Sequence, residues 1–153
     1  MFESIIKNLI KNKVSISFAE SCTGGALVST LTKVPGVSEI LEESFVTYSN
    51  ESKTKYLNIP KEVIDEKGVV SGDVAYLMVE GLYNITKARL CISTTGNAGP
   101  TRGDLSKDVG LIYVGIRFDG YTNIYELELY GSRKENIKEI TKFVYNKIEE
   151  LVL

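Results

Sequence analysis

The sequence predicts an α/β fold, a single-domain three-layer α/β/α sandwich with a mixed sheet, and three observations lead to this prediction. The chain has 153 residues, the usual length of one domain with one hydrophobic core. Helical and strand-like patterns alternate through most of it. Two more strand-like segments, joined by Asp119-Gly120, indicate a hairpin near the end. Because no repeat, low-complexity tract or linker interrupts the sequence, we expect residues 1–153 to form that one domain.

In the first half of the chain, hydrophobic spacing and turn residues indicate where helices and strands begin and end. Phe2, Ile6 and Leu9 fall on one stripe at helical spacing, whereas the β-branched segment after Lys13 alternates as in a strand. Pro35-Gly36 then ends a second helical segment. We expect, in order, a helix over 2–12, a strand over 14–18, a helix after Gly24-Gly25, a strand over 45–48 and a short helix over 50–57.

The second half contains clearer signals for the ends of its elements. Ser71 is suited to cap a helix whose first turn carries Asp73. Ser132 and Glu135 have the spacing of a capping box, so the last helix should start there. We expect, in order, a helix from Ser71 to Ile85, a strand over 89–95, a Gly-rich loop over 96–103, hairpin strands over 109–118 and 122–130, and a helix from Ser132 to Leu151.

The composition restricts the chemistry that the chain can perform. It has no histidine, so it cannot alone build a Ser-His-Asp or Cys-His nucleophile system, a His-ligated zinc site or a histidine general base. A base that works near neutral pH must therefore be a lysine, a carboxylate, a tyrosine or a cysteine. Nothing in the sequence demands a metal ion or another cofactor, and we expect none.

Charge and hydropathy restrict the partners. Eighteen Lys and Arg against twenty Asp and Glu give a net charge of −2, so no positive field attracts nucleic acid. The apolar segment 109–116 is far shorter than a membrane span, and residues 2–13 lack the features of a signal peptide. Cys22 and Cys91 are interpreted as reduced thiols. We therefore expect a cytoplasmic protein with no nucleic-acid or membrane partner.

Three polar segments each follow a predicted strand, namely residues 19–25, 46–53 and 93–100. Because ligands of open α/β sheets bind outside the carboxyl ends of strands, we expect these segments to meet in one pocket. In the first segment, unpaired N–H groups at a helix start can bind an anion or an oxyanion, and Ser21 or Cys22 is a candidate nucleophile. A plain helix cap with glycines that ease packing is the alternative interpretation.

Lys53 is the candidate base. It lies about one turn into the helix of the second segment, where partial burial would lower its pKa and allow it to deprotonate a serine. A solvated surface lysine is the alternative. Arg133 is either a ligand for an anion or a solvated side chain, and the loop at Thr95 and Gly96 is either part of a pocket or a turn that requires glycine.

The motifs of these segments together resemble the CinA C-terminal domain family. The resemblance rests on AESCTGG, VTYSNESK and STTGNAGP, followed by Lys107, Val109-Gly110 and GSR at 131–133. It covers residues 2–152 and is to the standalone form of the family. It implies a nicotinamide-nucleotide amidase, a homodimer that hydrolyses the carboxamide of nicotinamide mononucleotide to nicotinate mononucleotide and ammonia in pyridine-nucleotide recycling.

The resemblance also implies roles for single residues. Ser21 and Lys53 match a catalytic Ser-Lys dyad, and Arg133 with a helix N-terminus would hold the 5′-phosphate. Backbone N–H groups after Ser21 or in the loop at Gly96 would stabilise the oxyanion. We expect the nucleotide substrate to be bound by Cys22, Thr23, Gly24, Gly25, Tyr48, Thr95, Gly96, Asn97 and Arg133.

The sequence departs from the family pattern at three places. Glu43-Ser44 replace a pair of glycines, Asn97 replaces an aliphatic residue, and Asp108 replaces a proline. None of these positions belongs to the dyad, but Asn97 lies in a predicted pocket loop. Two alternatives stay open: Cys22 as the nucleophile, and a non-catalytic nucleotide-binding or assembly module that uses the same pocket.

Overall fold

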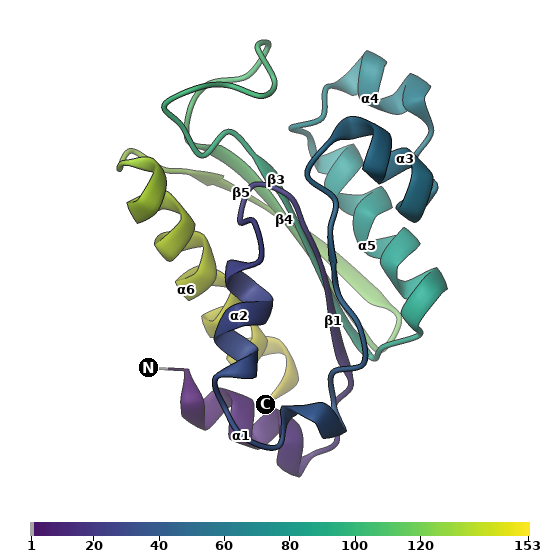
Figure 1. The fold of residues 1–153 in the computed structure, drawn as a ribbon, viewed down its shortest axis with the longest axis vertical. Helices are drawn as coiled ribbons and strands as arrows, with labels where there is room; N and C mark the ends of the chain where they lie inside the picture. Colours follow the sequence, from purple (N-terminus) through teal and green to yellow (C-terminus); the bar gives the residue numbers. More distant parts are fainter. Residues whose placement is uncertain (1) are drawn as a thin grey trace.

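The structure, a computed structural model, describes residues 2–153 and confirms the predicted three-layer sandwich around a mixed sheet (Figure 1). The helices are α1 (Glu3–Lys11), α2 (Ala26–Thr32), α3 (Asn50–Leu57), α4 (Lys61–Lys67), α5 (Gly72–Thr86) and α6 (Arg133–Val152), with a short 3-10 helix η1 at Val37–Glu39. The strands are β1 (Ile16–Glu20), β2 (Phe45–Val46), β3 (Leu90–Gly96), β4 (Leu111–Phe118) and β5 (Tyr121–Glu128).

The five strands lie in the order β2-β1-β3-β4-β5. Strand β1 runs parallel to both β2 and β3, whereas β4 is antiparallel to both of its neighbours. The carboxyl ends of β1, β2 and β3 therefore lie at the same edge of the sheet. The loops that follow these three strands are the three polar segments in which the sequence indicated chemistry.

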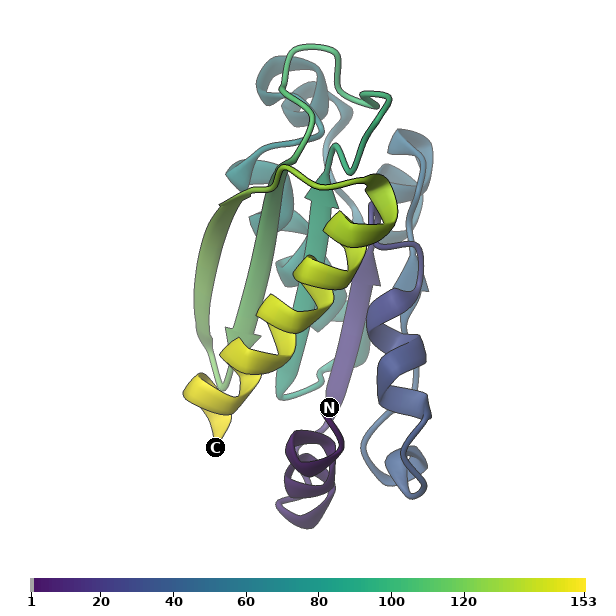
Figure 2. The ribbon, with the colours of Figure 1, turned by 90° about the vertical axis from the view of Figure 1, so that its left-hand side faces the viewer.

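Helices cover both faces of the sheet. Helices α1, α2 and α6 lie on one face, and α3, α4 and α5 lie on the other, as the two perpendicular views show (Figures 1 and 2). One apolar cluster, which includes Phe18, Leu27 and Tyr145, fills the first interface, and a second, which includes Leu57 and Met78, fills the other. All five residues of β1 are buried, as expected for a strand covered on both faces.

The helix starts are fixed by serine caps. The hydroxyls of Ser49, Ser71 and Ser132 each accept a backbone N–H three residues later, at the starts of α3, α5 and α6. Ser132 and Glu135 form the reciprocal capping box that their spacing predicts. Two of these capped helices, α3 and α6, begin beside the edge where the three polar loops meet.

Several predicted boundaries need correction. Strand β1 starts at Ile16 rather than at residue 14, because the N–H of Val14 still bonds to the carbonyl of Leu9 in the turn that ends α1. Strand β2 has two residues rather than four. Helix α4 was not predicted, because it has seven residues and only Ile64 is buried, which leaves no recognisable apolar stripe.

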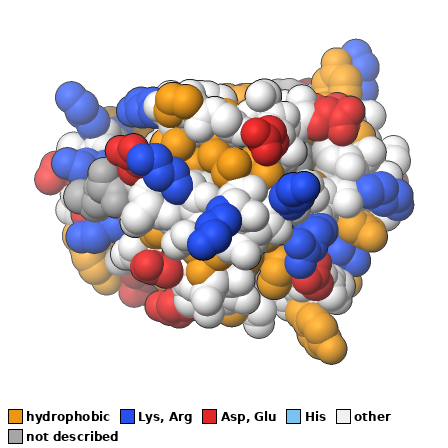
Figure 3. All heavy atoms as spheres, turned by 90° about the horizontal axis from the view of Figure 1, so that it is seen from below, with side chains coloured by type: hydrophobic (Ala, Val, Ile, Leu, Met, Phe, Trp, Pro, Cys, Tyr) orange, Lys and Arg blue, Asp and Glu red, His pale blue; other side chains and the backbone are white. Residues whose placement is uncertain are grey.

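Figure 3 shows the end of the molecule opposite the carboxyl edge of the sheet. Seen from that side, positive and negative side chains are intermixed around small apolar areas (Figure 3). Within residues 2–153, no helix has the length and apolar character needed to cross a bilayer.

Candidate active site

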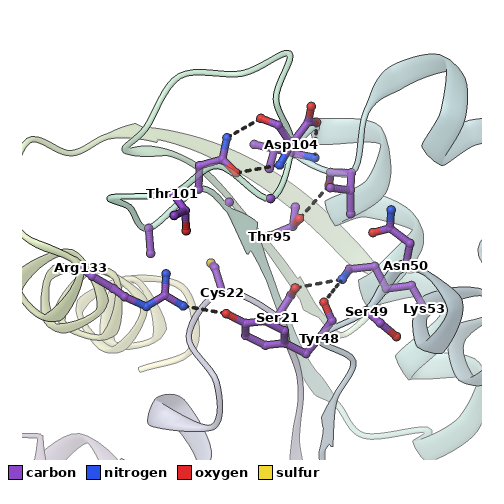
Figure 4. Close-up of a pocket in the computed structure, with 16 residues that line it drawn as sticks. Ser21, Cys22, Tyr48, Ser49, Asn50, Lys53, Thr95, Thr101, Asp104 and Arg133 are labelled. Atoms are coloured by element: carbon purple, nitrogen blue, oxygen red, sulfur yellow. Dashed lines mark hydrogen bonds between the residues drawn. The ribbon is translucent and has the colours of Figure 1, made fainter.

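A cavity of about 280 Å³ opens at the carboxyl edge of the sheet (Figure 4). Its walls come from the ends of β1, β2 and β3, from the starts of α3 and α6, and from the loop between β3 and β4. The lining residues are Ser21, Cys22, Tyr48, Ser49, Asn50, Lys53, Val69, Val70, Thr95, Gly96, Asn97, Ala98, Thr101, Gly103, Asp104 and Arg133. The three polar segments of the sequence thus converge on one cavity.

Ser21 and Lys53 meet in this cavity although they come from different elements. Ser21 directly follows β1, and Lys53 lies in the second turn of α3. The Lys53 Nζ atom is 2.9 Å from the Ser21 Oγ atom, and both residues are buried, with 1% and 8% of their surfaces exposed. The solvated-lysine interpretation of Lys53 is therefore wrong.

Burial of the Lys53 amine favours its neutral form. Burial lowers its pKa from the ordinary 10.5 to about 8. Its Nζ atom also lies 2.7 Å from the carbonyl oxygen of Thr47 and 3.4 Å from that of Tyr48. Lys53 Nζ donates to Ser21 Oγ when it is charged; once it is neutral, its two N–H groups can serve these carbonyls and its lone pair is left to accept the proton of Ser21. This arrangement suits a general base for serine.

Cys22, the competing nucleophile, differs from Ser21 in its surroundings. Burial raises the pKa of its thiol to about 12, so the thiol keeps its proton at neutral pH. The base in the cavity also bonds to Ser21 rather than to Cys22. Both observations favour Ser21 as the nucleophile. Cys22, which is 6% exposed, contributes a wall of the cavity.

The start of α2 is occupied by a side chain of the protein itself. Glu20 is fully buried, and its carboxylate accepts the N–H groups of Gly25, Leu27 and Val28. It also accepts the hydroxyl of Thr23 at 2.6 Å. These N–H groups are the ones that a helix start otherwise offers to an anion, so no substrate phosphate can use them.

This geometry corrects the expected substrate contacts of Thr23, Gly24 and Gly25, since none of the three lines the cavity. The Thr23 hydroxyl is held by Glu20 and by the hydroxyl of Thr94 on β3. Gly24 and Gly25 have φ angles of 58° and 102°, which a residue with a Cβ atom rarely adopts. Their role is to form the turn that presents Ser21.

Arg133 and Tyr48 close one side of the cavity. A guanidinium N–H of Arg133 donates to the hydroxyl oxygen of Tyr48 at 2.6 Å, and another donates to the carbonyl of Gly99 at 3.0 Å. Arg133 is also the first residue of α6, a helix of 20 residues whose N-terminus carries partial positive charge. The cavity thus has a cationic side at Arg133.

Asn97 lines the cavity, but its amide is engaged by the loop between β3 and β4. Its Nδ2 group donates to the carbonyls of Asp104, Lys107 and Asp108, and its Oδ1 atom accepts the N–H of Asp104. The Asp104 carboxylate in turn accepts the N–H of Val70. The structure therefore assigns to Asn97 a role in holding this loop, with its substrate contact limited to the wall that it forms.

Several cavity residues are not among the predicted site residues. Asn50 lies inside the motif VTYSNESK, and its place on the same face of α3 as Lys53 was a usable signal. Val69, Val70, Thr101 and Asp104 lie in the segment before α5 and in the loop after β3, which only the folded chain brings beside the dyad. Their sequence carries no pattern that could have identified them.

Comparisons with known proteins identify the same family as the motifs. The CinA C-terminal domain family matches residues 1–152. A relative from Alkaliphilus oremlandii, with the provisional name competence-damage inducible protein, is 43% identical over 151 residues, which are 99% of this chain and 37% of the relative. A relative of the same name from Clostridium botulinum is 44% identical, over 91% of this chain and 34% of the relative. The chain thus spans about a third of the length of these curated relatives.

Solved structures share the fold. A CinA superfamily protein from Escherichia coli superposes with a TM-score of 0.93 at 24% identity, covering 99% of this chain and 91% of that one. A competence/damage inducible protein from Agrobacterium tumefaciens gives 0.86 at 30% identity, covering 99% and 93%. With these structures and a family match over nearly every residue, we conclude that the chain belongs to the CinA C-terminal domain family.

Proposed function

We propose that the protein is a nicotinamide-nucleotide amidase that converts nicotinamide mononucleotide to nicotinate mononucleotide and ammonia. The observation that carries the proposal is the contact of 2.9 Å between Lys53 Nζ and Ser21 Oγ inside a cavity. A buried lysine with a lowered pKa is costly to the fold, and it supplies the base that a histidine-free serine hydrolase needs. The substrate and its place in nucleotide recycling come from the family motifs.

The reaction has two halves. In the first, neutral Lys53 takes the proton of Ser21 while the serine oxygen attacks the carboxamide carbon. The Lys53 ammonium then protonates the departing nitrogen, the C–N bond breaks, and ammonia leaves behind an ester of Ser21. In the second half, Lys53 takes a proton from water, whose oxygen attacks the ester, and the proton returns to Ser21 as nicotinate mononucleotide leaves.

The oxyanion of both halves is stabilised by the N–H of Cys22. The residue after a nucleophilic serine is a common oxyanion donor. Within residues 2–153, no backbone or side-chain oxygen accepts this N–H, so it is available to a substrate. The neighbouring N–H of Ser21 instead donates to the hydroxyl of Thr94, which helps to fix the turn.

The phosphate of the substrate binds on the side of Arg133. The start of α2 is filled by the Glu20 carboxylate, whereas Arg133 lines the cavity and is the first residue of α6, whose N-terminus carries partial positive charge. The reactive carboxamide then lies toward Ser21 and Lys53. One side of the cavity thus recognises the anion, and the other performs the chemistry.

A timed ammonia assay with nicotinamide mononucleotide, nicotinamide riboside and free nicotinamide tests the function. We expect fastest release from the mononucleotide, because only it carries the phosphate for Arg133. A nucleotide-binding module is the rival function, and it would show a thermal shift with the mononucleotide but no ammonia. That result would disprove the amidase proposal.

A further inference from the structure

We propose that Asn50 recognises the primary carboxamide of the substrate, with its side-chain oxygen accepting an N–H of the –NH2 group that will leave. Asn50 is the first residue of α3 and lines the cavity. It lies three residues before Lys53, so the two side chains are on the same face of the helix. Figure 4 shows the Asn50 amide above the Lys53 side chain, directed into the cavity. This inference rests on the proposed amidase function and adds a residue that selects amides.

The first argument is an inventory of the polar side chains that line the cavity. Ser21 and Lys53 bond to each other, and the Ser49 hydroxyl caps α3. The Thr95 hydroxyl donates to the carbonyl of Val69, and Asn97 and Asp104 are bonded within their loop. Arg133 and Tyr48 bond to each other. Among the polar lining residues that the structure describes, only Asn50 and Thr101 have a side chain whose oxygen and nitrogen atoms make no hydrogen bond at all.

The positions of these two residues separate their roles. Thr101 lies in the loop after β3, across the cavity from α3 (Figure 4). Asn50 lies one turn of α3 before Lys53, the residue that must give a proton to the leaving nitrogen. Its amide offers one acceptor oxygen and one NH2 donor, so it can pair with a carboxamide group, which has the same two functions.

The second argument concerns the acceptors that a leaving –NH2 group needs. Two carbonyl oxygens beside the dyad, those of Thr47 and Tyr48, each accept a hydrogen bond from the Lys53 amine. The carboxamide nitrogen carries two N–H groups, and each of them needs an acceptor once it leaves water. The free oxygen of Asn50 supplies one. An ester of the same acid has no N–H at this position and gains nothing from the Asn50 oxygen.

Selectivity for amides over esters therefore tests the inference. The substrates are nicotinamide mononucleotide and the methyl ester of nicotinate mononucleotide, and the common product is followed by chromatography. In Asn50→Ala, we expect kcat/KM for the amide to fall about thirtyfold and that for the ester less than about threefold, because a site loses discrimination when its partner for a substrate N–H is removed. Asn50→Asp keeps an acceptor oxygen and should preserve the preference for the amide.

Glu51→Ala is the matched control, because Glu51 is the next residue of α3, is exposed and does not line this cavity. Thermal unfolding of each variant shows that it folds. If Asn50→Ala lowers the two rates equally, or changes neither, Asn50 does not recognise the amide and the proposed function stands. If the wild-type protein forms no product from the amide, the proposed function is wrong and the inference is overturned with it.

Discussion

The Lys53 Nζ atom lies 2.9 Å from the Ser21 Oγ atom, although the two residues are 32 positions apart in the sequence. The contact depends on the parallel pairing of β1 and β2, which brings the start of α3 beside the turn that follows β1. Glu20 reinforces this arrangement, since its backbone carbonyl accepts the N–H of Thr47 while its side chain holds the start of α2. The contact thus depends on the turn after β1, the start of α2 and the start of α3, which lie at the same edge of the sheet.

If Ser21 and Lys53 act as a unit, their substitutions should not be additive. We expect Ser21→Ala and Lys53→Ala each to lower kcat at least about a hundredfold, and the double variant to be little worse than either. The measurement is the rate of ammonia release from nicotinamide mononucleotide. Cys22→Ala is the control and should keep most activity, because its thiol is protonated at neutral pH. Effects that multiply in the double variant would show that the two residues act separately.

The pH dependence of kcat/KM should report the protonation of Lys53 in the free enzyme. Since burial lowers the pKa of Lys53 to about 8, we expect the rate to rise with pH with unit slope and to level off above about pH 8. An initial-rate profile from pH 6 to 9.5 measures this. A profile that is flat across this range, or that falls as pH rises, would be incompatible with Lys53 as the base.

The same pKa predicts how stability changes with pH. A pKa of about 8 in the folded chain, against the ordinary 10.5, means that the unfolded chain binds more protons between these values, so the wild-type protein gains stability as pH rises through this window. Relative to Lys53→Met, which has no titrating group there, the gain should be about 3 kcal/mol. Urea unfolding of both proteins at pH 7.5 and at pH 10.5 measures it. If the free energy of unfolding of the wild-type protein minus that of Lys53→Met stays constant or falls between these two pH values, Lys53 is not desolvated.

Glu20 should support turnover through the turn that it holds. In the wild-type protein, both carboxylate oxygens of Glu20 accept backbone N–H groups. Glu20→Gln replaces one of these oxygens with an NH2 group, which cannot accept, so we expect a loss of about 1–3 kcal/mol in unfolding free energy. Because Ser21 is the next residue, kcat should fall more than KM rises. Glu39→Gln, at an exposed glutamate, should change neither quantity. If Glu20→Gln and Glu39→Gln had the same unfolding free energy and the same kcat, the Glu20 carboxylate would be dispensable.

The layers of the fold, and the pocket where Ser21 and Lys53 meet, could be predicted from local signals and from the three polar segments. Helical stripes, the serine caps and the Asp119-Gly120 turn are local signals, and the structure has each of them. The absence of histidine left Lys53 as the base best placed for a serine. Two sets of contacts were not predicted: those of the Glu20 carboxylate with the start of α2, and those of the Asn97 amide with the loop between β3 and β4. Both depend on which backbone groups lie near these side chains after folding.

Covalent labelling of Ser21 by a fluorophosphonate tests the central claim most directly. The serine oxygen displaces fluoride from phosphorus and loses its proton to Lys53, so the intact mass rises by the mass of the phosphonyl group, and peptide mapping locates it. We predict one label on Ser21 in the wild-type protein, none in Ser21→Ala, and labelling at least about a hundredfold slower in Lys53→Met. A label on Cys22 or elsewhere, or an undiminished rate in Lys53→Met, would contradict the Ser21–Lys53 dyad.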